Sequence, residues 1–392
     1  MPTFRAFVLS CAVLSGAAGC SDSTGPSGSP PAQTLAIGGG HICRIVSSTT
    51  SCWGGGALGQ LGIDATPADT TPVILDAPAF TSIAAGETHT CALDAAGQAW
   101  CWGSNRDGEL GTGTLVNDSC GGTPCQRHPV QVATTARFTA LAAGSFFTCG
   151  LTESHALMCW GVNDAGQLAT TADTNRCEAV RCSLTPLPTS AAHPFVQIVA
   201  GRKHACGLTT DGQAWCWGFE AISETGTHLT RARFSPEQVS QSGTLRFRAI
   251  SAGGYHSCAI AEAGTAWCWG LDAMGAGTDT LESPDPVRVA GSTTFRQIQS
   301  GRLTSCALDQ DGKTYCWGAN SDGSVGVEPI GSAVRFDVPV AAGGSLRFQS
   351  LIGGSGNYCG TTSEGRTLCW GRGDENQLLN NHADAATPTP LP

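Results

Sequence analysis

The stretch FTSIAAGETHTCALDAAGQAWCWG, residues 80–103, is the best-preserved copy of a unit that recurs along this chain of 392 residues. Its last three residues, Cys-Trp-Gly, occur seven times, starting at Cys52, Cys101, Cys159, Cys216, Cys268, Cys316 and Cys369. A second cysteine precedes each copy, by ten residues in six units and by nine in the first. Neighbouring copies lie 48 to 58 residues apart, a period typical of propellers and other repeat folds.

Each unit is predicted to form four short antiparallel strands. Three apolar segments, residues 80–86, 89–93 and 98–103, are bounded by glycines and turn residues. Pro129-Val130-Gln131-Val132 suggests a fourth strand, and similar segments occur at 286–289 and 338–340. Repeats of about 50 residues with four strands are propeller blades. We therefore expect an all-β fold, a seven-bladed β-propeller of four-stranded antiparallel blades.

Turn length predicts how the repeated cysteines pair. If Cys91 faces Cys101, the hairpin between them closes with the three-residue loop 95–97. Gly97 is then the third loop residue, which has a left-handed backbone conformation in hairpins of this length. The two cysteines then lie at a non-hydrogen-bonded position with Cα atoms about 4.5 Å apart, which suits a disulfide. The first unit keeps the same pairing with a two-residue turn, Ser47-Ser48. The predicted bridges are Cys43–Cys52, Cys91–Cys101, Cys149–Cys159, Cys206–Cys216, Cys258–Cys268, Cys306–Cys316 and Cys359–Cys369.

The first 33 residues are typical of an export signal and a tether. Arg5 precedes an apolar run, 6–18, which is too short to cross a membrane as a helix. Residues 17–20, Ala-Ala-Gly-Cys, resemble the lipobox of bacterial lipoproteins, which implies cleavage after residue 19 and a lipid on Cys20. Residues 20–33 would form a flexible tether. We expect a lipid anchor in a bacterial membrane, with the outer membrane as one candidate, facing the periplasm or exterior; the alternative is a secreted soluble protein.

Four further cysteines lie outside the repeat, in two long insertions at about 112–128 and 169–194. They are Cys120, Cys125, Cys177 and Cys182. Export favours oxidised cysteines, although four thiolates could also hold zinc. Three disulfide connectivities are possible, of which pairing within each Cys-x4-Cys is the simplest.

The unit resembles the repeat of the regulator of chromosome condensation family. Ala85–His89, Leu93, Gly97 and Trp102–Gly111 carry the resemblance, and Gly161–Leu168 repeats part of it. The resemblance implies one seven-bladed propeller over residues 34–392. Because the first unit has no Pro-x-Val segment before it while residues 388–392 supply a proline-rich one, we expect the C-terminal tail to complete the first blade.

Composition and motifs argue against several function classes. The net charge of -10 and the pI near 5.3 disfavour nucleic acid, which is bound by lysine and arginine. HExxH, nucleophile-elbow, Walker and EF-hand motifs are absent, so we expect neither an enzyme nor a cofactor. His41, His89, His204 and His256 recur two residues before a blade cysteine; we interpret them as bonding backbone groups at a turn, with a metal ring as the alternative. The repeated tryptophans are expected to pack between blades.

Two sets of variable residues are candidates for binding. The turns before each histidine, which should gather at one end of the central channel, contain Glu87, Phe146, Arg202, Lys203, Tyr255 and Arg302. An insertion at 219–236 adds Arg231 and Arg233. Phe, Tyr and Arg are typical of interface hot spots, and loops on a rigid scaffold commonly bind partners. Solvated loop residues without a partner are the alternative interpretation.

Function follows from fold only through analogy. The family includes a nuclear GTPase exchange factor, a plant ultraviolet receptor and secreted propellers that inhibit β-lactamases. We expect a monomeric binding or scaffold protein that recognises another exported or cell-surface protein, with inhibition of a secreted enzyme as a special case. A carbohydrate or cell-wall binding propeller and a lyase-type propeller enzyme are the alternatives.

Overall fold

The computed structural model describes residues 33–64, 69–115, 118–172, 175–177, 180–189, 193–219, 232–239, 244–271, 275–277, 282–331, 334–380 and 383–391. These ranges contain thirty strands and no helix, and so no helix that could cross a membrane. The predicted signal peptide (1–19), Cys20 and all of the tether except Gln33 lie outside the described residues.

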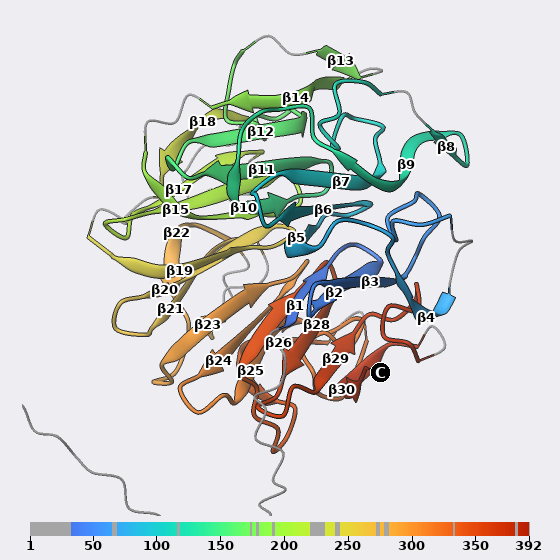
Figure 1. Cartoon of the computed structure of the whole chain (residues 1–392). Coiled ribbons are helices and arrows are strands. Elements are labelled where there is room, and N and C mark those ends of the chain that lie inside the picture. Colours follow the sequence, from blue (N-terminus) through green and yellow to red (C-terminus); the bar gives the residue numbers. More distant parts are fainter. Residues whose placement is uncertain are drawn as a thin grey trace, which may run out of the picture. The chain divides into compact units, whose positions relative to one another are not determined.

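Seven antiparallel sheets, blades 1 to 7 in chain order, form the propeller (Figure 1). Their innermost strands are β1 (Gln33–Ile37), β5 (Phe80–Ala85), β10 (Phe138–Ala143), β15 (Phe195–Ala200), β19 (Phe247–Ala252), β23 (Phe295–Ser300) and β27 (Ser350–Gly353). The second strands are β2 (His41–Val46), β6 (His89–Asp94), β11 (Phe147–Thr152), β16 (His204–Thr209), β20 (His256–Ala261), β24 (Thr304–Asp309) and β28 (Asn357–Thr361).

The outer half of each blade follows the same order. The third strands are β3 (Thr49–Gly54), β7 (Ala99–Ser104), β12 (Leu157–Val162), β17 (Ala214–Gly218), β21 (Ala266–Leu271), β25 (Thr314–Ala319) and β29 (Thr367–Gly371). The fourth are β4 (Asp69–Ile74), β9 (Thr123–Gln131), β14 (Val180–Pro188), β18 (Arg233–Gln238), β22 (Glu282–Arg288), β26 (Arg335–Ala342) and β30 (Ala385–Pro390). Blades 2 and 3 add a short fifth strand, β8 (Asp118–Cys120) and β13 (Asn175–Cys177).

The hairpin between the second and third strands agrees with the sequence prediction. Cys91 lies opposite Cys101, and all seven predicted intra-blade disulfides are present with Cα–Cα distances of 4.0–4.1 Å. Gly97 has a φ of 72°, and Ser47 and Ser48 both have positive φ values, as a two-residue hairpin turn requires. In blade 3 His155 takes the left-handed position with a φ of 61°.

The prediction that the tail completes the first blade is wrong. Strand β30 pairs with β29 of its own blade, where Cys369 lies opposite Thr389. Blade 1 has its own fourth strand, β4, in which Val73 lies opposite Cys52, as Val130 lies opposite Cys101 in blade 2. Each blade is therefore made of consecutive strands, and the ring must close without a shared sheet.

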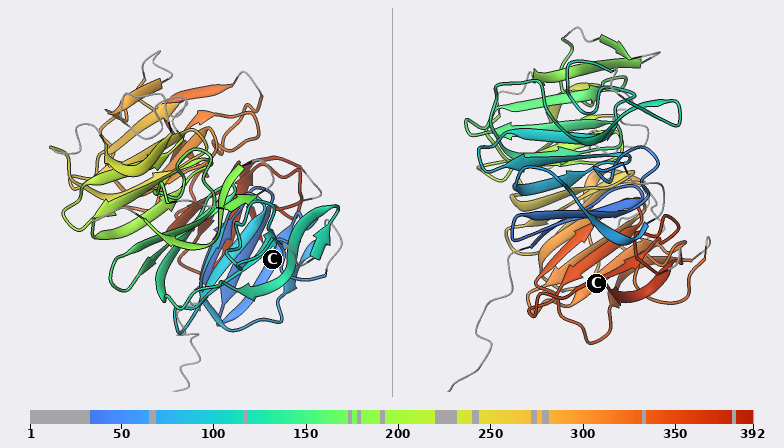
Figure 2. Two further views of the ribbon diagram at one scale, coloured as in Figure 1. Left: turned by 90° about the horizontal axis from the view of Figure 1, so that it is seen from above. Right: turned by 45° about the vertical axis from the view of Figure 1, so that its right-hand side comes forward.

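Buried tryptophans join the blades and close the ring. Each Cys-Trp-Gly tryptophan packs in an apolar cluster with the preceding blade. Five of them donate an indole N–H hydrogen bond to a backbone carbonyl there, at 2.9–3.1 Å. These bonds are Trp102 to Gln60, Trp160 to Glu109, Trp217 to Gln167, Trp370 to Ser324 and Trp53 to Gln377. The bond from Trp53 joins blade 1 to blade 7, and the blue first blade lies beside the red last blade in both views of Figure 2. Packing of these tryptophans between blades is thus confirmed.

The closing bond can be tested with two matched variants, W53F and W269F. Both remove the same volume from a fully buried site, but the Trp269 indole nitrogen has no acceptor among the described residues. W53F also leaves the carbonyl of Gln377 without its donor, so it should lower the free energy of unfolding by about 1 kcal/mol more than W269F. Denaturant unfolding measures the difference, and equal losses in the two variants would contradict the proposed role of the bond.

Glu109 is a fully buried carboxyl group at a position where blades 1, 3 and 7 have glutamine. Its Oε1 accepts a hydrogen bond from Ser104 Oγ at 2.6 Å, and its Oε2 accepts one from the N–H of Asp107 at 2.8 Å. Burial raises the pKa of Glu109 from 4.5 to about 7, although these hydrogen bonds lower it. The folded protein therefore holds a proton on Glu109 at pH values where the unfolded chain has lost it.

We expect E109Q to remove this pH dependence. Because the folded pKa is the higher one, the contribution of Glu109 to stability is complete below pH 4.5 and is lost as the pH rises through about 7. E109Q should accordingly stabilise the protein more at pH 8 than at pH 5, as measured by thermal melting. E153Q, at an exposed glutamate, is the control and should behave like wild type at both pH values. The same gain at pH 5 and pH 8 would refute the shift.

Candidate functional site

A cavity of about 420 Å³ lies on the axis of the ring, at the end where the innermost strands finish. Its wall consists of the small last residues of these strands, such as Ala85, Ala143 and Ala200, and of the glycine that follows each of them. The next residue of each turn surrounds the opening, which we call the channel mouth: Gly39, Glu87, Ser145, Arg202, Gly254, Arg302 and Ser355. The prediction that the turns before the histidines gather at one end of the channel is confirmed.

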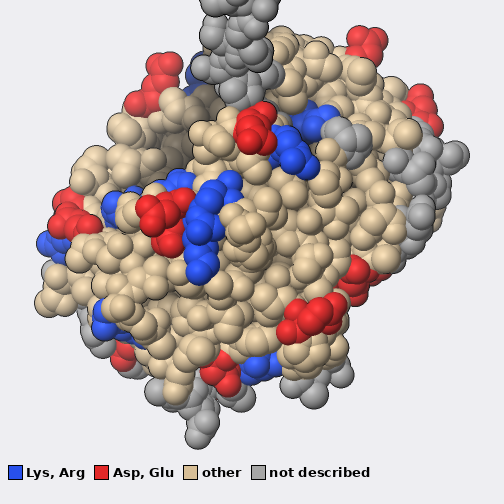
Figure 3. All heavy atoms as spheres, turned by 90° about the horizontal axis from the view of Figure 1, so that it is seen from below, with Lys and Arg blue, Asp and Glu red and all other residues tan. Residues whose placement is uncertain are grey.

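The cavity wall is more basic than the protein as a whole. Three arginines, Arg202, Arg302 and Arg372, and one acid, Glu87, line it, whereas the whole chain carries a net charge of -10. On the face of the molecule drawn in Figure 3, a few Lys and Arg side chains lie beside Asp and Glu side chains, and most of the surface is uncharged. Arg372 is not among the binding residues predicted from the sequence. Its signal is a basic residue directly after the last Cys-Trp-Gly, where the other six copies have Gly, Ser, Val, Phe, Leu or Ala.

Three predicted residues lie on one side of the channel mouth, on blades 4 to 6: Arg202 and Arg302 belong to the mouth, and Tyr255 directly follows its Gly254. The guanidinium of Arg202 donates a hydrogen bond to the hydroxyl of Tyr255 and lies 5.4 Å from the centre of its ring. Arg302 is exposed, and no residue in the described ranges forms a hydrogen bond or ion pair with its side chain. We call Arg202, Gly254, Tyr255 and Arg302 the basic arc.

The opposite side of the channel mouth is acidic. Arg372 forms an ion pair with Asp374. Burial lowers the pKa of Arg372, but Asp374, Glu87 and Glu375 together raise it above its ordinary value. The positive charge of Arg372 is therefore balanced by nearby carboxylates, in contrast to that of the basic arc.

The other predicted residues lie elsewhere. Phe146 is half-buried beside the mouth and does not line the cavity, and Lys203 extends outwards to Asp164, with 4.0 Å between Nζ and Oδ2. Arg233 is buried and paired with Glu237, so it presents no binding group at the surface. Its burial comes from its place at the start of β18, which the position in a long insertion did not indicate. Arg231 lies outside the described residues.

The four repeated histidines are fully buried links between blades. Each Nε2 lies 2.7–2.9 Å from a hydroxyl of the next blade: His41 to Thr90, His89 to Thr148, His204 to Ser257 and His256 to Ser305. We expected these histidines to bond backbone groups at a turn. That interpretation is wrong for Nε2, whose partner is a side-chain hydroxyl of the next blade. Among the described residues, no three His, Cys, Asp or Glu side chains are placed to hold a metal ion.

A sequence signal for these links exists. The residue directly before each blade cysteine is Thr or Ser in every blade that follows a histidine blade. Where the histidine position holds Phe147, the next blade has Ala205, and the two residues share one apolar cluster. The histidine and hydroxyl positions therefore change together from blade to blade.

The buried histidines predict loss of stability in acid. Burial lowers their pKa values from 6.5 to about 3 or 4. The unfolded chain binds protons below pH 6.5 that the folded histidines do not, so the free energy of unfolding falls between pH 6.5 and about 4. H89F/T148A copies the natural Phe147 and Ala205 pair and should show a smaller drop in melting temperature from pH 7 to pH 5 than wild type. T148A alone serves as the control, and a drop as large as wild type in the double variant would disprove the histidine effect.

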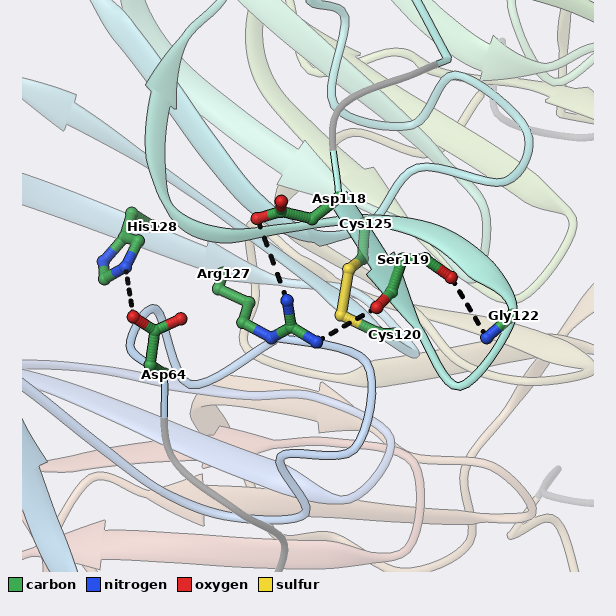
Figure 4. A network of polar contacts seen from close by, with 8 residues as sticks. All are labelled: Asp64, Asp118, Ser119, Cys120, Gly122, Cys125, Arg127 and His128. Carbon is green, nitrogen blue, oxygen red and sulfur yellow. Dashed lines mark hydrogen bonds and ion pairs between the residues drawn. A yellow bond between two sulfur atoms is a disulfide. The ribbon is translucent and has the colours of Figure 1, made fainter.

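Two disulfide-closed hairpins project from blades 2 and 3. Cys120 pairs with Cys125 and Cys177 with Cys182, which confirms the simplest of the possible connectivities. In the first hairpin Arg127 lies 3.9 Å from Asp118 and donates to the carbonyl of Ser119 (Figure 4). These polar contacts are exposed and contribute little stability, so the disulfides are the main constraint on the shape of the hairpins.

The fold and the channel mouth together define a class: a rigid seven-bladed propeller whose repeat positions hold the ring together and whose turn positions vary. The chain belongs to the RCC1-like family, since the RCC1-like domain matches residues 49–392. It is 28% identical over 243 residues to the mitochondrial RCC1 domain-containing protein RUG3 of Arabidopsis thaliana. The aligned region covers 61% of this chain and 53% of that protein. It is 29% identical over 255 residues to the ultraviolet-B receptor UVR8 of the same plant, covering 63% of this chain and 55% of the receptor.

The chain thus spans about half the length of these two relatives.

Solved structures agree on the fold. Yeast RCC1 (Prp20) bound to Kap60 has a TM-score of 0.74 at 22% identity, covering 92% of this chain and 84% of that one. Human WBSCR16 has a TM-score of 0.75 at 18% identity, covering 87% and 92%.

Proposed function

We propose that this protein is an exported, lipid-anchored binding or scaffold protein that uses the channel mouth to bind another exported protein. The observation that carries the proposal is the exposed basic arc on an otherwise rigid ring. Arg and Tyr are enriched among residues that dominate binding energy at protein interfaces. Inhibition of a secreted enzyme is one form that such binding could take.

The ring favours binding because its recognition residues are already ordered. Every Gly-x-x turn of the mouth lies between an innermost strand and a disulfide-bonded hairpin, so little conformational entropy is lost when a partner docks. Related propellers support the idea by analogy: yeast RCC1 was solved bound to Kap60, and Prp20p of Saccharomyces cerevisiae is described with binding to Gsp1p and histones. The export and anchoring of this chain rest on residues 1–33.

A carbohydrate partner has less support. All ten tryptophans lie in the described residues, and none is fully exposed. Seven are completely buried between blades, and the remaining three, Trp100, Trp215 and Trp267, are half-buried. The described part of the chain therefore has no fully exposed tryptophan on which a sugar ring could stack.

Photocrosslinking tests the proposal at defined positions. The light-activated residue p-benzoylphenylalanine is introduced at Phe146, beside the channel mouth, or at Arg347, an exposed residue next to the start of β27 and so at the opposite end of the ring. In cells that export the protein, irradiation should produce protein adducts from position 146 and not from position 347. Adducts of equal yield from both positions, no adduct from 146, or an adduct that glycosidases but not proteases remove would each refute the proposal.

A further inference from the structure

We infer that the basic arc is a carboxylate site that takes a short acidic segment of the protein partner. The inference rests on the proposed function, because it names the chemistry of the partner at the same face. Three observations carry it: the backbone bonds that place two arginines on neighbouring turns, the glycine at the turn position between them, and N–H donors that the described residues leave available.

Backbone hydrogen bonds between blades set the positions of the two arginines. The N–H of Arg202 donates to the carbonyl of Gly253 at 3.2 Å, and the N–H of Gly254 donates to the carbonyl of Gly301 at 2.9 Å. Arg202, Gly254 and Arg302 therefore take the same turn position on three consecutive blades that are bonded to each other. Both guanidinium groups extend from this rigid segment and not from long loops.

Gly254 lets the turn of blade 5 pack against the backbone of Arg302 and adds no side chain between the two arginines. A Cβ atom there would lie 2.7 Å from the carbonyl oxygen of Arg302 and 3.0 Å from its Cα, too close for any side chain without movement of the backbone. At the mouth, the turn position between Arg202 and Arg302 therefore adds no side chain, while Ala252 and Ser300, the last residues of β19 and β23, line the cavity wall with small side chains. The inferred ligand would enter from the mouth, where both arginines line the cavity.

The two guanidinium groups keep N–H donors that no described residue uses. A guanidinium carries five N–H donors, and Arg202 uses one on Tyr255, a contact that also orients its plane. Arg302 uses none on the described residues. Planar, paired donors match a carboxylate, which accepts two parallel hydrogen bonds from an arginine.

Size and charge limit the occupant to a short segment. A cavity of about 420 Å³ can hold one or two side chains but no folded element. Glu87 lines the same cavity, and Asp374 and Glu375 lie near it, so a long acidic run would meet repulsion on that side. The structure therefore favours one or two carboxylates that enter from the mouth next to neutral residues.

Titration calorimetry with acetyl-Ala-Glu-Glu-Ala-amide tests the assignment on the purified, oxidised protein. We expect binding that weakens as salt rises, since exposed charge pairs are screened. R202A and R302A should each raise Kd at least fivefold, and R202A/R302A should abolish binding. R347A removes the same charge from the opposite end of the ring and should leave Kd unchanged, and thermal melting confirms that each variant folds.

The outcomes separate this inference from the proposed function. Wild-type affinity in R202A/R302A, or equal binding of the glutamine analogue of the peptide, would overturn the carboxylate site. Free succinate that binds as tightly as the peptide would overturn the peptide occupant in favour of a small dicarboxylate. If position 146 crosslinks to a protein while the acidic peptide does not bind, the carboxylate site is wrong and the proposed function stands; if the peptide binds and no crosslink forms, the proposed function fails instead.

Discussion

The ring depends on one repeated contact: a buried tryptophan of each blade packs against the preceding blade. At five of the seven junctions its indole N–H also donates a hydrogen bond to a backbone carbonyl there. In blades 1 and 2 the same carbonyl, that of Gln60, accepts both Trp102 at 3.0 Å and the hydroxyl of Thr90 at 3.1 Å, and that hydroxyl in turn lies 2.8 Å from His41 Nε2. A carbonyl oxygen has two lone pairs, and here both are used by the next blade. Because the acceptor is a backbone carbonyl, the residue that supplies it can have a Gln, Glu or Ser side chain while the tryptophan is retained.

This junction explains how the ring closes without a shared sheet. Ile37, Ile42 and Trp53 of blade 1 pack in one apolar cluster with Leu378 and the disulfide cysteines of blade 7. The contact is of the same kind as those between other blades, so closure adds one more copy of a repeated interface. Disulfides then act within blades and tryptophans act between them.

Local patterns predicted the fold, and contacts between distant residues set the limit of that prediction. Turn length is enough to place Cys91 opposite Cys101, since both residues lie within one hairpin. It gives no information on whether a proline-rich strand pairs within its own blade or across the ring, and the assignment of the tail failed there. Arg233 is a similar case: its burial depends on β17 and Glu237, and an isolated arginine in a long insertion shows neither.

The candidate site lies where the residues of the repeat differ from blade to blade. At the first turn position the seven blades have Gly, Glu, Ser, Arg, Gly, Arg and Ser, while the glycine before it is retained because a Cβ there would lie within 3 Å of a neighbouring side chain or backbone oxygen. The scaffold thus constrains the first glycine of every turn. The next position varies, and packing requires glycine there only in blades 1 and 5, where a Cβ on Gly39 or Gly254 would lie within 3 Å of a backbone oxygen of the next blade. A local excess of arginine on a chain of net charge -10 cannot come from overall composition. It arises where packing makes no demand on the side chain, and for that reason the basic arc is where selection for a partner can act.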